Sequence, residues 1–364
     1  MSNKKLSQLA LIAAIMVIAA VAVHHTSNKP AQPSQTPTYL IQGLDPDKVA
    51  AIVIKADETS VNLHRRGETF VVSEKDDYPA MTDRINQLFT ELMNIRTKEL
   101  ITDKPQNHAD LEVTQDKAQS IVRFLDKDAN TITGLILGKS TEAGGSYARL
   151  IDENRVYLCE NIPYIRAGAT DYIDQQLVSA KQEDIISVTV TDANGQTYTL
   201  QSEPNSTDIT LAGSLPQGKK PGPQFKSVFS ALTSLRFDDV IKQGSEPNNV
   251  TFNRTYICRL KDSTEYILKL AKTADKTYAA CSAVFKDTEE ITIDRTKQES
   301  DEELKRKEAK LLAHDAAEKL NAKCKGWTYE LPSWKADSLT KPLNDILEDV
   351  KPEKPQPATD ANTP

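Results

Sequence analysis

An internal duplication constrains the fold of this chain more than any other feature of the sequence. DKVAAIVIKADETSVNLHRR, from Asp47, resembles EDIISVTVTDANGQTYTLQS, from Glu183. Each segment has an acidic start, an alternating apolar strand, a polar turn and a second alternating strand, and this alternation is typical of β-structure. Blocks that match in the same order predict one supersecondary unit that occurs twice. The other matching blocks are 85–101 with 225–241, and 120–128 with 256–264.

Each copy is predicted to be an α+β unit. After the first strands, residues 80–95 change to helical spacing, with one apolar stripe of Ile85, Leu88, Phe89, Leu92 and Ile95. Short polar turns favour antiparallel pairing of the strands that follow, because parallel strands need long crossovers. We therefore expect two tandem repeats of an antiparallel β-meander with a packed helix. Those strands are expected near 119–126, 131–138, 146–151 and 155–159.

The two repeats are predicted to occupy residues 45–180 and 181–349. The second repeat also contains a charged segment, roughly residues 299–323, with the spacing of a helix. We expect this helix to dock on the sheet through its apolar side. The residues of that side are Leu304, Leu311, Leu312, Ala316 and Leu320.

The N-terminus carries an apolar run that predicts a membrane anchor at residues 1–25. Lys4 and Lys5 precede the run over residues 6–23, which would be a helix about 27 Å long at ~1.5 Å per residue. That length nearly spans a bilayer core of about 30 Å. The lysines would hold the N-terminus in the cytoplasm. We expect a single-pass protein of the inner membrane that is bound to the lipid bilayer by this helix, with the bulk of the chain in the periplasm.

A cleaved signal peptide is the alternative interpretation of the same run. Residues 20–22, Ala-Val-Ala, form an acceptable small-x-small cleavage site. Both interpretations export the rest of the chain. Residues 26–44 are rich in Pro, Ser, Thr and Gln and are predicted to be a flexible linker, and the similar residues 350–364 are predicted to be a disordered tail.

Composition argues against a nucleic-acid partner. The net charge is -7 and the pI is near 5.5. The sequence contains no cluster of basic residues. Binding to nucleic acid requires many Lys and Arg residues on one face to displace counterions. Aromatic residues make up only 6% of the chain, which is too few for stacking along a single strand.

The stretch LILGKST at residues 135–141 raises the possibility of a phosphate-binding loop. A P-loop requires a second glycine five residues before its Gly-Lys-Ser/Thr, and Thr133 occupies that position. The matching stretch of the second copy, LKLAKT, has Ala271 where the first copy has Gly138. We therefore predict a hairpin turn at Gly138-Lys139-Ser140, and neither a nucleotide nor a cofactor is expected.

No catalytic or metal-binding set can be recognised. The four cysteines, Cys159, Cys258, Cys281 and Cys324, form no C-x-x-C pair, and no histidine lies at ligand spacing from them. In an oxidising compartment Cys258 and Cys281 are the first candidates for a disulfide, whereas buried free thiols are the alternative. The five histidines are scattered, without a G-x-S-x-G context. No catalytic, cofactor-binding or metal-ligating residue is assigned, and the chain is predicted not to be an enzyme.

The chain resembles a bacterial family of envelope proteins that carry domain of unknown function 4340. The resemblance covers residues 45–349 and rests on VAAIVI, YPAMTDRINQLFTELMNI, the LILGKS…YARL…VYL strand series and WTYELP. It implies a single-pass protein, often encoded beside ABC-type export permeases and gliding-motility-like components. The implied role is an extracytoplasmic accessory subunit. The family implies no catalytic residues for this sequence.

The leading hypothesis is therefore a membrane-anchored periplasmic accessory protein with protein partners in an envelope complex, an ABC-type export system, and no catalysis of its own. One alternative is an envelope hydrolase or carbohydrate-active enzyme with a site between the two repeats, where clefts are common. Another is a secreted ligand-binding module released by signal cleavage.

Overall fold

The computed structural model describes residues 38–142, 144–203, 208–245, 250–289 and 300–350. The predicted anchor at residues 1–25, much of the linker and nearly all of the tail lie outside the described residues. Within the described ranges, no helix has both the length and the apolar character needed to cross a membrane. The chain divides into two compact units, residues 1–60 with 83–167, and residues 61–82 with 168–364.

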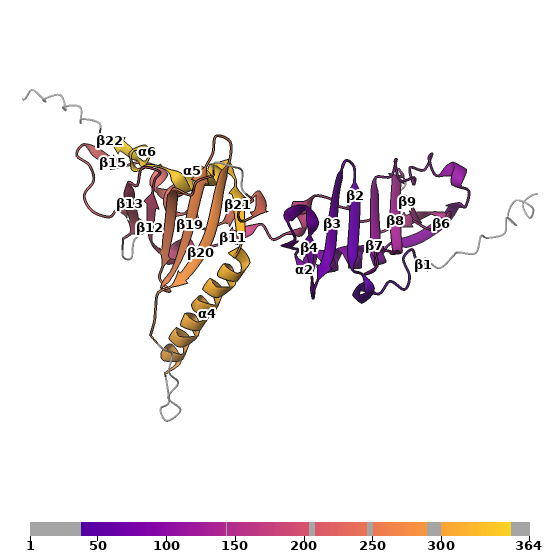
Figure 1. Cartoon of the computed structure of the whole chain (residues 1–364), viewed down its shortest axis with the longest axis horizontal. Coiled ribbons are helices and arrows are strands. Elements are labelled where there is room, and N and C mark those ends of the chain that lie inside the picture. Colours follow the sequence, from indigo (N-terminus) through magenta and orange to yellow (C-terminus); the bar gives the residue numbers. More distant parts are fainter. Residues whose placement is uncertain (1–37, 143, 204–207, 246–249, 290–299, 351–364) are drawn as a thin grey trace, which may run out of the picture. The chain divides into compact units, whose positions relative to one another are not determined.

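The first large sheet is antiparallel and has ten strands in the order β1-β6-β10-β9-β8-β7-β2-β3-β4-β5 (Figure 1). One helix, α2 (Thr82–Met93), accompanies it. The strands are β1 (Thr38–Tyr39), β2 (Ala51–Ala56), β3 (Thr59–Arg66), β4 (Thr69–Val72), β5 (Tyr78–Pro79), β6 (Arg96–Thr102), β7 (Ser120–Leu125), β8 (Thr131–Ser140), β9 (Ser146–Leu150) and β10 (Val156–Glu160).

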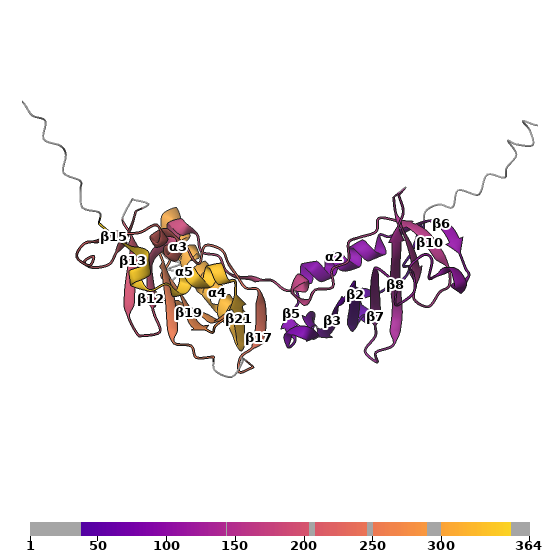
Figure 2. The same ribbon diagram turned by 90° about the horizontal axis from the view of Figure 1, so that it is seen from above.

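Helix α2 packs on one face of this sheet (Figure 2). In β2 every second residue is buried, including Ile52 and Ile54, because successive strand side chains point to opposite faces. The apolar stripe predicted for α2 is buried against that face. Phe89 of α2 stacks on Phe124 of β7, with ring centroids 5.3 Å apart. The apolar residues of the strands and the apolar stripe of α2 thus pack together in one core.

The second large sheet is also antiparallel, with eight strands in the order β14-β13-β12-β18-β19-β20-β21-β17. Its strands are β12 (Ile185–Thr191), β13 (Thr197–Ser202), β14 (Ile209–Leu211), β17 (Asp239–Lys242), β18 (Arg254–Leu260), β19 (Thr264–Lys272), β20 (Thr277–Phe285) and β21 (Trp327–Leu331). The helices of this part are α3 (Gln224–Phe229), α4 (Asp301–Cys324), α5 (Ser333–Thr340) and α6 (Leu343–Ile346). Two small sheets pair β11 (Gln176–Val178) with β16 (Leu235–Arg236), and β15 (Lys219–Pro221) with β22 (Leu347–Asp349).

The two large sheets share one strand order. Reading β6-β10-β9-β8-β7-β2-β3-β4 across the first sheet gives the same succession as β17-β21-β20-β19-β18-β12-β13-β14 across the second. In each case a helix, α2 or α3, comes before the strand at the β6 or β17 position. The α+β class with antiparallel sheets is confirmed.

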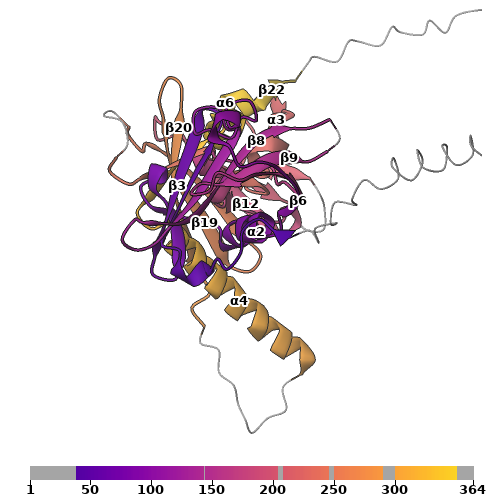
Figure 3. The ribbon, with the colours of Figure 1, turned by 90° about the vertical axis from the view of Figure 1, so that its right-hand side faces the viewer.

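Helix α4 has no counterpart in the first sheet. Strands β9 and β10 are joined by a short turn, whereas α4 stands between the corresponding strands β20 and β21. The helix begins with a capping box, in which the Ser300 hydroxyl accepts from the Glu303 N–H at 3.3 Å and the Glu303 carboxylate accepts from the Ser300 N–H at 3.0 Å. Figure 3 shows α4 extending beyond the sheet.

The docked side of α4 differs from the prediction. Ala313 and Ala317 are buried, whereas Leu304, Leu311 and Leu312 are 50%, 56% and 60% exposed. Small side chains face the sheet because they let the helix approach it closely. The prediction was therefore wrong for Leu304, Leu311 and Leu312, whereas Leu320 is partly buried.

The predicted disulfide between Cys258 and Cys281 is absent, and all four cysteines are buried free thiols. Cys258 lies on β18 and Cys281 on β20, with β19 between them. Neighbouring strands are about 4.8 Å apart, so two strand spacings exceed the ~7 Å limit on the Cα separation of bridged cysteines. Meander order therefore excludes this pair.

Within the second unit, residues 61–82 contact the end of the sheet at β17. Lys75 forms an ion pair with Asp239 at 2.6 Å, and the Lys242 N–H donates to the Asp76 carboxylate at 3.3 Å. Tyr78 contacts Trp327 edge-on, with centroids 4.9 Å apart. These polar and aromatic contacts cover the outer edge of β17.

Glu265 of β19 forms ion pairs with two basic residues, Arg259 and Lys286. It is buried, and Arg259 of the adjacent strand donates to its carboxylate at 2.6 and 2.9 Å, while Lys286 lies 3.3 Å away. Burial alone would raise the pKa of Glu265, but the hydrogen bonds from Arg259 and Lys286 outweigh it and lower that pKa below its usual value.

We expect Glu265→Gln to lower the free energy of unfolding by about 1–2 kcal/mol at pH 7. A depressed folded pKa means that the carboxylate stabilises the fold above its unfolded pKa of about 4.3, and that this contribution is lost as pH falls below that value. Urea unfolding at pH 7 and pH 3 should show the deficit shrinking in acid. The exposed Glu318→Gln is the control, and a deficit that does not change with pH would contradict the assignment.

Candidate functional site

The LILGKST stretch is part of a continuous strand. Gly138, Lys139 and Ser140 complete β8, and backbone hydrogen bonds between Thr141 and Gly144 and between Thr141 and Gly145 make the turn before β9. The predicted hairpin turn at Gly138-Lys139-Ser140 is therefore displaced toward the C-terminus. The ammonium group of Lys139 donates to the backbone carbonyl of Asp110. Lys139 thus holds the 109–113 turn against the end of β8.

Gly138 is required by the close approach of that turn. A Cβ atom on Gly138 would lie 2.2 Å from the Leu111 carbonyl oxygen, a separation that real structures do not show. The turn is fixed from its other side by Arg149, whose Nε donates to the Val113 carbonyl at 2.8 Å. The same guanidinium donates to the carbonyls of Leu150 and Ile151. The glycine that suggested a phosphate loop therefore has a packing role.

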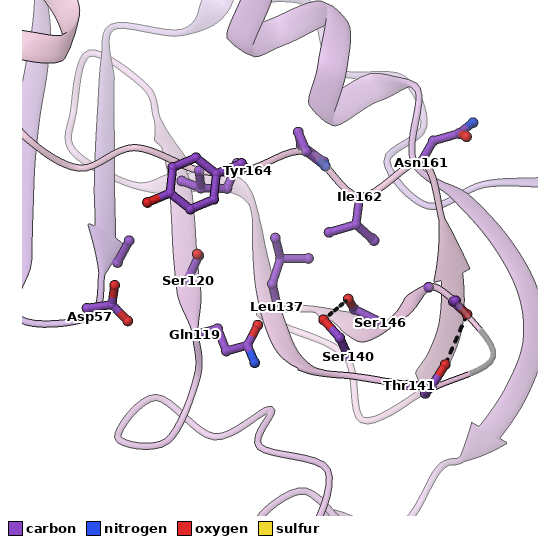
Figure 4. A pocket seen from close by; sticks show the side chains of 15 residues that line it. Asp57, Gln119, Ser120, Leu137, Ser140, Thr141, Ser146, Asn161, Ile162 and Tyr164 are labelled. Carbon is purple, nitrogen blue, oxygen red and sulfur yellow. Dashed lines mark hydrogen bonds between the residues drawn. The ribbon is translucent and has the colours of Figure 1, made fainter.

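A pocket of about 620 Å³ opens beside this strand end (Figure 4). Its walls come from the β2–β3 turn, the start of β7, the end of β8 with Thr141, residues 144–146, and residues 161–165. Figure 4 shows Asp57, Gln119, Ser120 and Tyr164 on one side of the pocket, and Ser140, Thr141 and Ser146 on the other. Tyr164 is 84% exposed and forms part of the rim.

Hydrogen bonds hold the polar wall in place. The hydroxyls of Ser140 and Ser146 lie 3.0 Å apart, and the Thr141 hydroxyl donates to the Gly144 carbonyl at 3.0 Å. Gly145 adopts a φ of +89°, and a Cβ there would lie 2.5 Å from the Cys159 carbonyl oxygen. A glycine is needed at this position for both reasons. The wall is therefore built before any ligand arrives.

The chemistry of the pocket favours neutral polar ligands. Asp57 is the only ionisable carboxylate among the lining residues, which otherwise offer hydroxyl, amide and apolar groups. Glycoside hydrolysis needs two carboxylates, and nucleophilic catalysis needs a nucleophile with a base beside it. The lining residues contain neither arrangement. Neutral hydroxyl and amide groups beside an exposed ring can hydrogen-bond and stack on a sugar or an amide.

A second feature is the α4 leucine surface, which we define as Leu304, Leu311 and Leu312. At ~100° per residue, Leu304 and Leu311 lie almost in line along the helix, with Leu312 beside them. Leu304 is half exposed, and Leu311 and Leu312 are more exposed than buried. Glu308 and Asp315 share this face by helical spacing. The result is an apolar strip with acidic residues along it.

No catalytic, metal or cofactor residues were predicted from the sequence. Across the described ranges, no three His, Cys, Asp or Glu side chains come together in a way that could hold a metal ion. His64 is beside Ser73 and Asp77, His108 is bonded to the Asn154 carbonyl, and His314 is edge-on to Phe285. These three histidines, which are the ones in the described ranges, are thus not brought together.

Sequence reasoning did not find the pocket or the leucine surface. The pocket is assembled from four segments that are separated in the sequence, and none of them has a motif of its own. The leucines were visible, but they were assigned to the wrong side of α4. The only signal in the sequence for the buried side of α4 is the pair of small residues Ala313 and Ala317, one helical turn apart.

We expect Gly138→Ala to destabilise the protein by about 1–3 kcal/mol, because the new methyl group must displace the Leu111 carbonyl. Chemical denaturation of the purified protein measures this. Ser140→Ala, two residues further along the same strand, is the control and should cost less than 1 kcal/mol, roughly one hydrogen bond. Equal stability of Gly138→Ala and wild type would show that the turn can move away without cost.

Comparison with known proteins gives a family and no named relative. A family profile described as Domain of unknown function (DUF4340) matches residues 71–256, just over half of the chain. No curated protein and no solved structure matches the chain. The matched region includes α2, the strand series from β6 to β10 and Arg149, all of which the fold uses for packing. The chain belongs to the DUF4340 family.

Proposed function

We propose that this protein is a non-enzymatic accessory subunit of an envelope complex, an ABC-type export system, and that it works through protein contacts. The observation that carries the proposal is the α4 leucine surface. Burial of these three exposed leucines against a partner would stabilise the complex. Complete burial of one leucine side chain contributes about 1.5–3 kcal/mol. Apolar strips of this kind, rimmed by polar residues, are typical of protein-binding surfaces.

The position of α4 in the fold supports this role. The first sheet builds the same strand order without such a helix, so the sheet architecture does not require α4. We infer that the chain contains two tandem repeats and that the second gained α4 at a turn. Turns are where folds tolerate insertions and where binding residues concentrate. An inserted helix with an exposed apolar strip fits a groove on a partner, with anchors spaced at i, i+7 and i+8.

The proposed location follows from the N-terminal sequence. The apolar run with Lys4 and Lys5 before it predicts an anchor in the inner membrane and an extracytoplasmic chain. Residues 26–44 would then separate the folded part from the bilayer. In this arrangement α4 is presented to extracytoplasmic parts of a permease. The single predicted span makes the protein an auxiliary component, since one helix cannot enclose a channel.

Mild crosslinking in cells, detergent extraction of tagged full-length protein and mass spectrometry test the proposal. We expect permease and ATPase subunits to be recovered in a near-fixed ratio with the wild type. Leu311→Glu combined with Leu312→Glu should reduce that recovery by about tenfold or more, because each charge removes an apolar anchor worth ~1–2 kcal/mol.

Ala309→Glu is the control matched to Leu311→Glu alone, since each adds one negative charge to the same helix. It should leave recovery unchanged, because it lies outside the α4 leucine surface. Circular dichroism of each variant confirms that α4 remains folded. Recovery of the protein alone from wild-type cells would overturn the export-complex proposal. Equal loss for the leucine and alanine variants would show that the leucine surface is not the contact.

A second candidate function is ligand binding in the pocket beside β8, as expected of a secreted or anchored binding module. The exposed ring of Tyr164 above a wall of hydroxyl groups favours it. We expect a neutral oligosaccharide to bind there, and Tyr164→Ala to weaken binding about tenfold, as loss of a stacking contact does. Calorimetry with a panel of neutral oligosaccharides measures this.

Trp334→Ala, which removes another exposed aromatic ring, from the second unit, is the control for that experiment. It should leave the affinity unchanged. A panel without a binder, or equal weakening by both variants, would remove the pocket as a candidate site.

A further inference from the structure

Cys281 and Cys324 are brought together by the way α4 runs along β20. Contacts between the two elements pair Asp287 with Lys310, Phe285 with His314 and Ala283 with Asn321. Along these contacts the residue numbers of β20 decrease while those of α4 increase, so the helix and the strand run antiparallel. Two residues before Ala283 comes Cys281, on the same face of the strand, and three residues after Asn321 comes Cys324, on the same side of the helix.

Asn321 fixes this register. Its side-chain amide donates to the Ala283 carbonyl and accepts from the Ala283 N–H, both at 2.8 Å. One turn of helix advances about 5 Å and two strand residues about 7 Å. The next pair of facing positions is therefore Cys281 and Cys324. Their thiols interact with each other, and both line a surface pocket of about 500 Å³.

The two thiols differ from the other two cysteines in their chemistry. The hydrogen bond from Cys281 lowers the pKa of Cys324, while the same bond and burial raise the pKa of Cys281. Burial alone raises the pKa of Cys159 and of Cys258 to about 12. Only the thiolate attacks a disulfide, so Cys324 is the reactive member of the set.

We propose that Cys281 and Cys324 are a disulfide-forming pair that, on oxidation, joins the last turn of α4 covalently to β20. This inference goes beyond the proposed function and does not depend on it. The oxidant is an external disulfide, such as a thiol–disulfide oxidoreductase or oxidised glutathione. A bridge here would fix the inserted helix to the sheet at the end opposite its exposed leucines.

The reaction balances as a two-step exchange. The Cys324 thiolate attacks one sulfur of the external disulfide, a mixed disulfide forms, and the other external sulfur leaves as a thiolate. Cys281 then loses its proton and attacks the Cys324 sulfur, which releases the second external thiol. The protein gives up two electrons and two protons, and the external disulfide takes them as two thiols. The pocket bounded by Gln243, Lys269 and Trp327 provides the path for the reagent.

The test uses full-length protein in detergent, equilibrated with oxidised and reduced glutathione. Thiols counted after unfolding should fall from four to two, and peptide mapping under non-reducing conditions should join the peptides that contain Cys281 and Cys324. We expect the oxidised form to melt roughly 5–10 °C above the reduced form, because the bridge closes a loop of 43 residues between positions 281 and 324.

Matched variants separate this pair from any other. Cys258→Ser should still lose two thiols on oxidation, from three to one, whereas Cys281→Ser and Cys324→Ser should keep all three. Peptide mapping of the oxidised wild-type protein identifies the bridged cysteines without any variant. It therefore still tests the proposal if a serine variant fails to fold. Four thiols after oxidation, a bridge to Cys159 or Cys258, or only intermolecular bridges would overturn the proposal.

Discussion

The pairing of β2 with β7, and of β12 with β18, is the constraint on which the rest of the structure depends. These strands are far apart in sequence, with Ile52 opposite Phe124 and Val188 opposite Cys258. The chain that follows β2 or β12 must therefore move away from that strand and later return to its other side. In each case the intervening chain contains strands on one side of the pair, a helix and a strand near the far side of the sheet, which is β6 beside the edge strand β1 in the first sheet and the edge strand β17 in the second. Long-range pairing of this kind is slow to form and commits the topology once it has formed.

Much of the fold could be predicted from local periodicity, because a half-buried strand and an amphipathic helix leave different apolar patterns. The strand at 131–138 was found as Thr131–Ser140, and the helix at 80–95 as Thr82–Met93. The face of α4 was not predictable in this way. A helix seated on a sheet through alanines buries little apolar area, so the larger leucines outside gave the stronger pattern.

The binding features were harder to predict than the elements that carry them, for a physical reason. The pocket depends on Asp57, Gln119 and Tyr164 reaching one point from distant segments. Facing cysteines depend on which strand lies next to the helix. Sequence spacing suggested a pair of Cys258 and Cys281, but β19 lies between their strands. The residue that faces Cys281 is Cys324, because α4 runs along β20. Relations between elements of this kind leave no local pattern.

The edges of both sheets are short or occupied. The first sheet ends in the two-residue strands β1 and β5, and β5 contains Pro79, which has no N–H to offer. In the second sheet β14 has three residues, and the Lys242 N–H of β17 is already bonded to Asp76. Such edges give an incoming strand little backbone to pair with. Pairing of an incoming strand with β5 or β14 is therefore disfavoured, which limits edge-to-edge aggregation through these two strands.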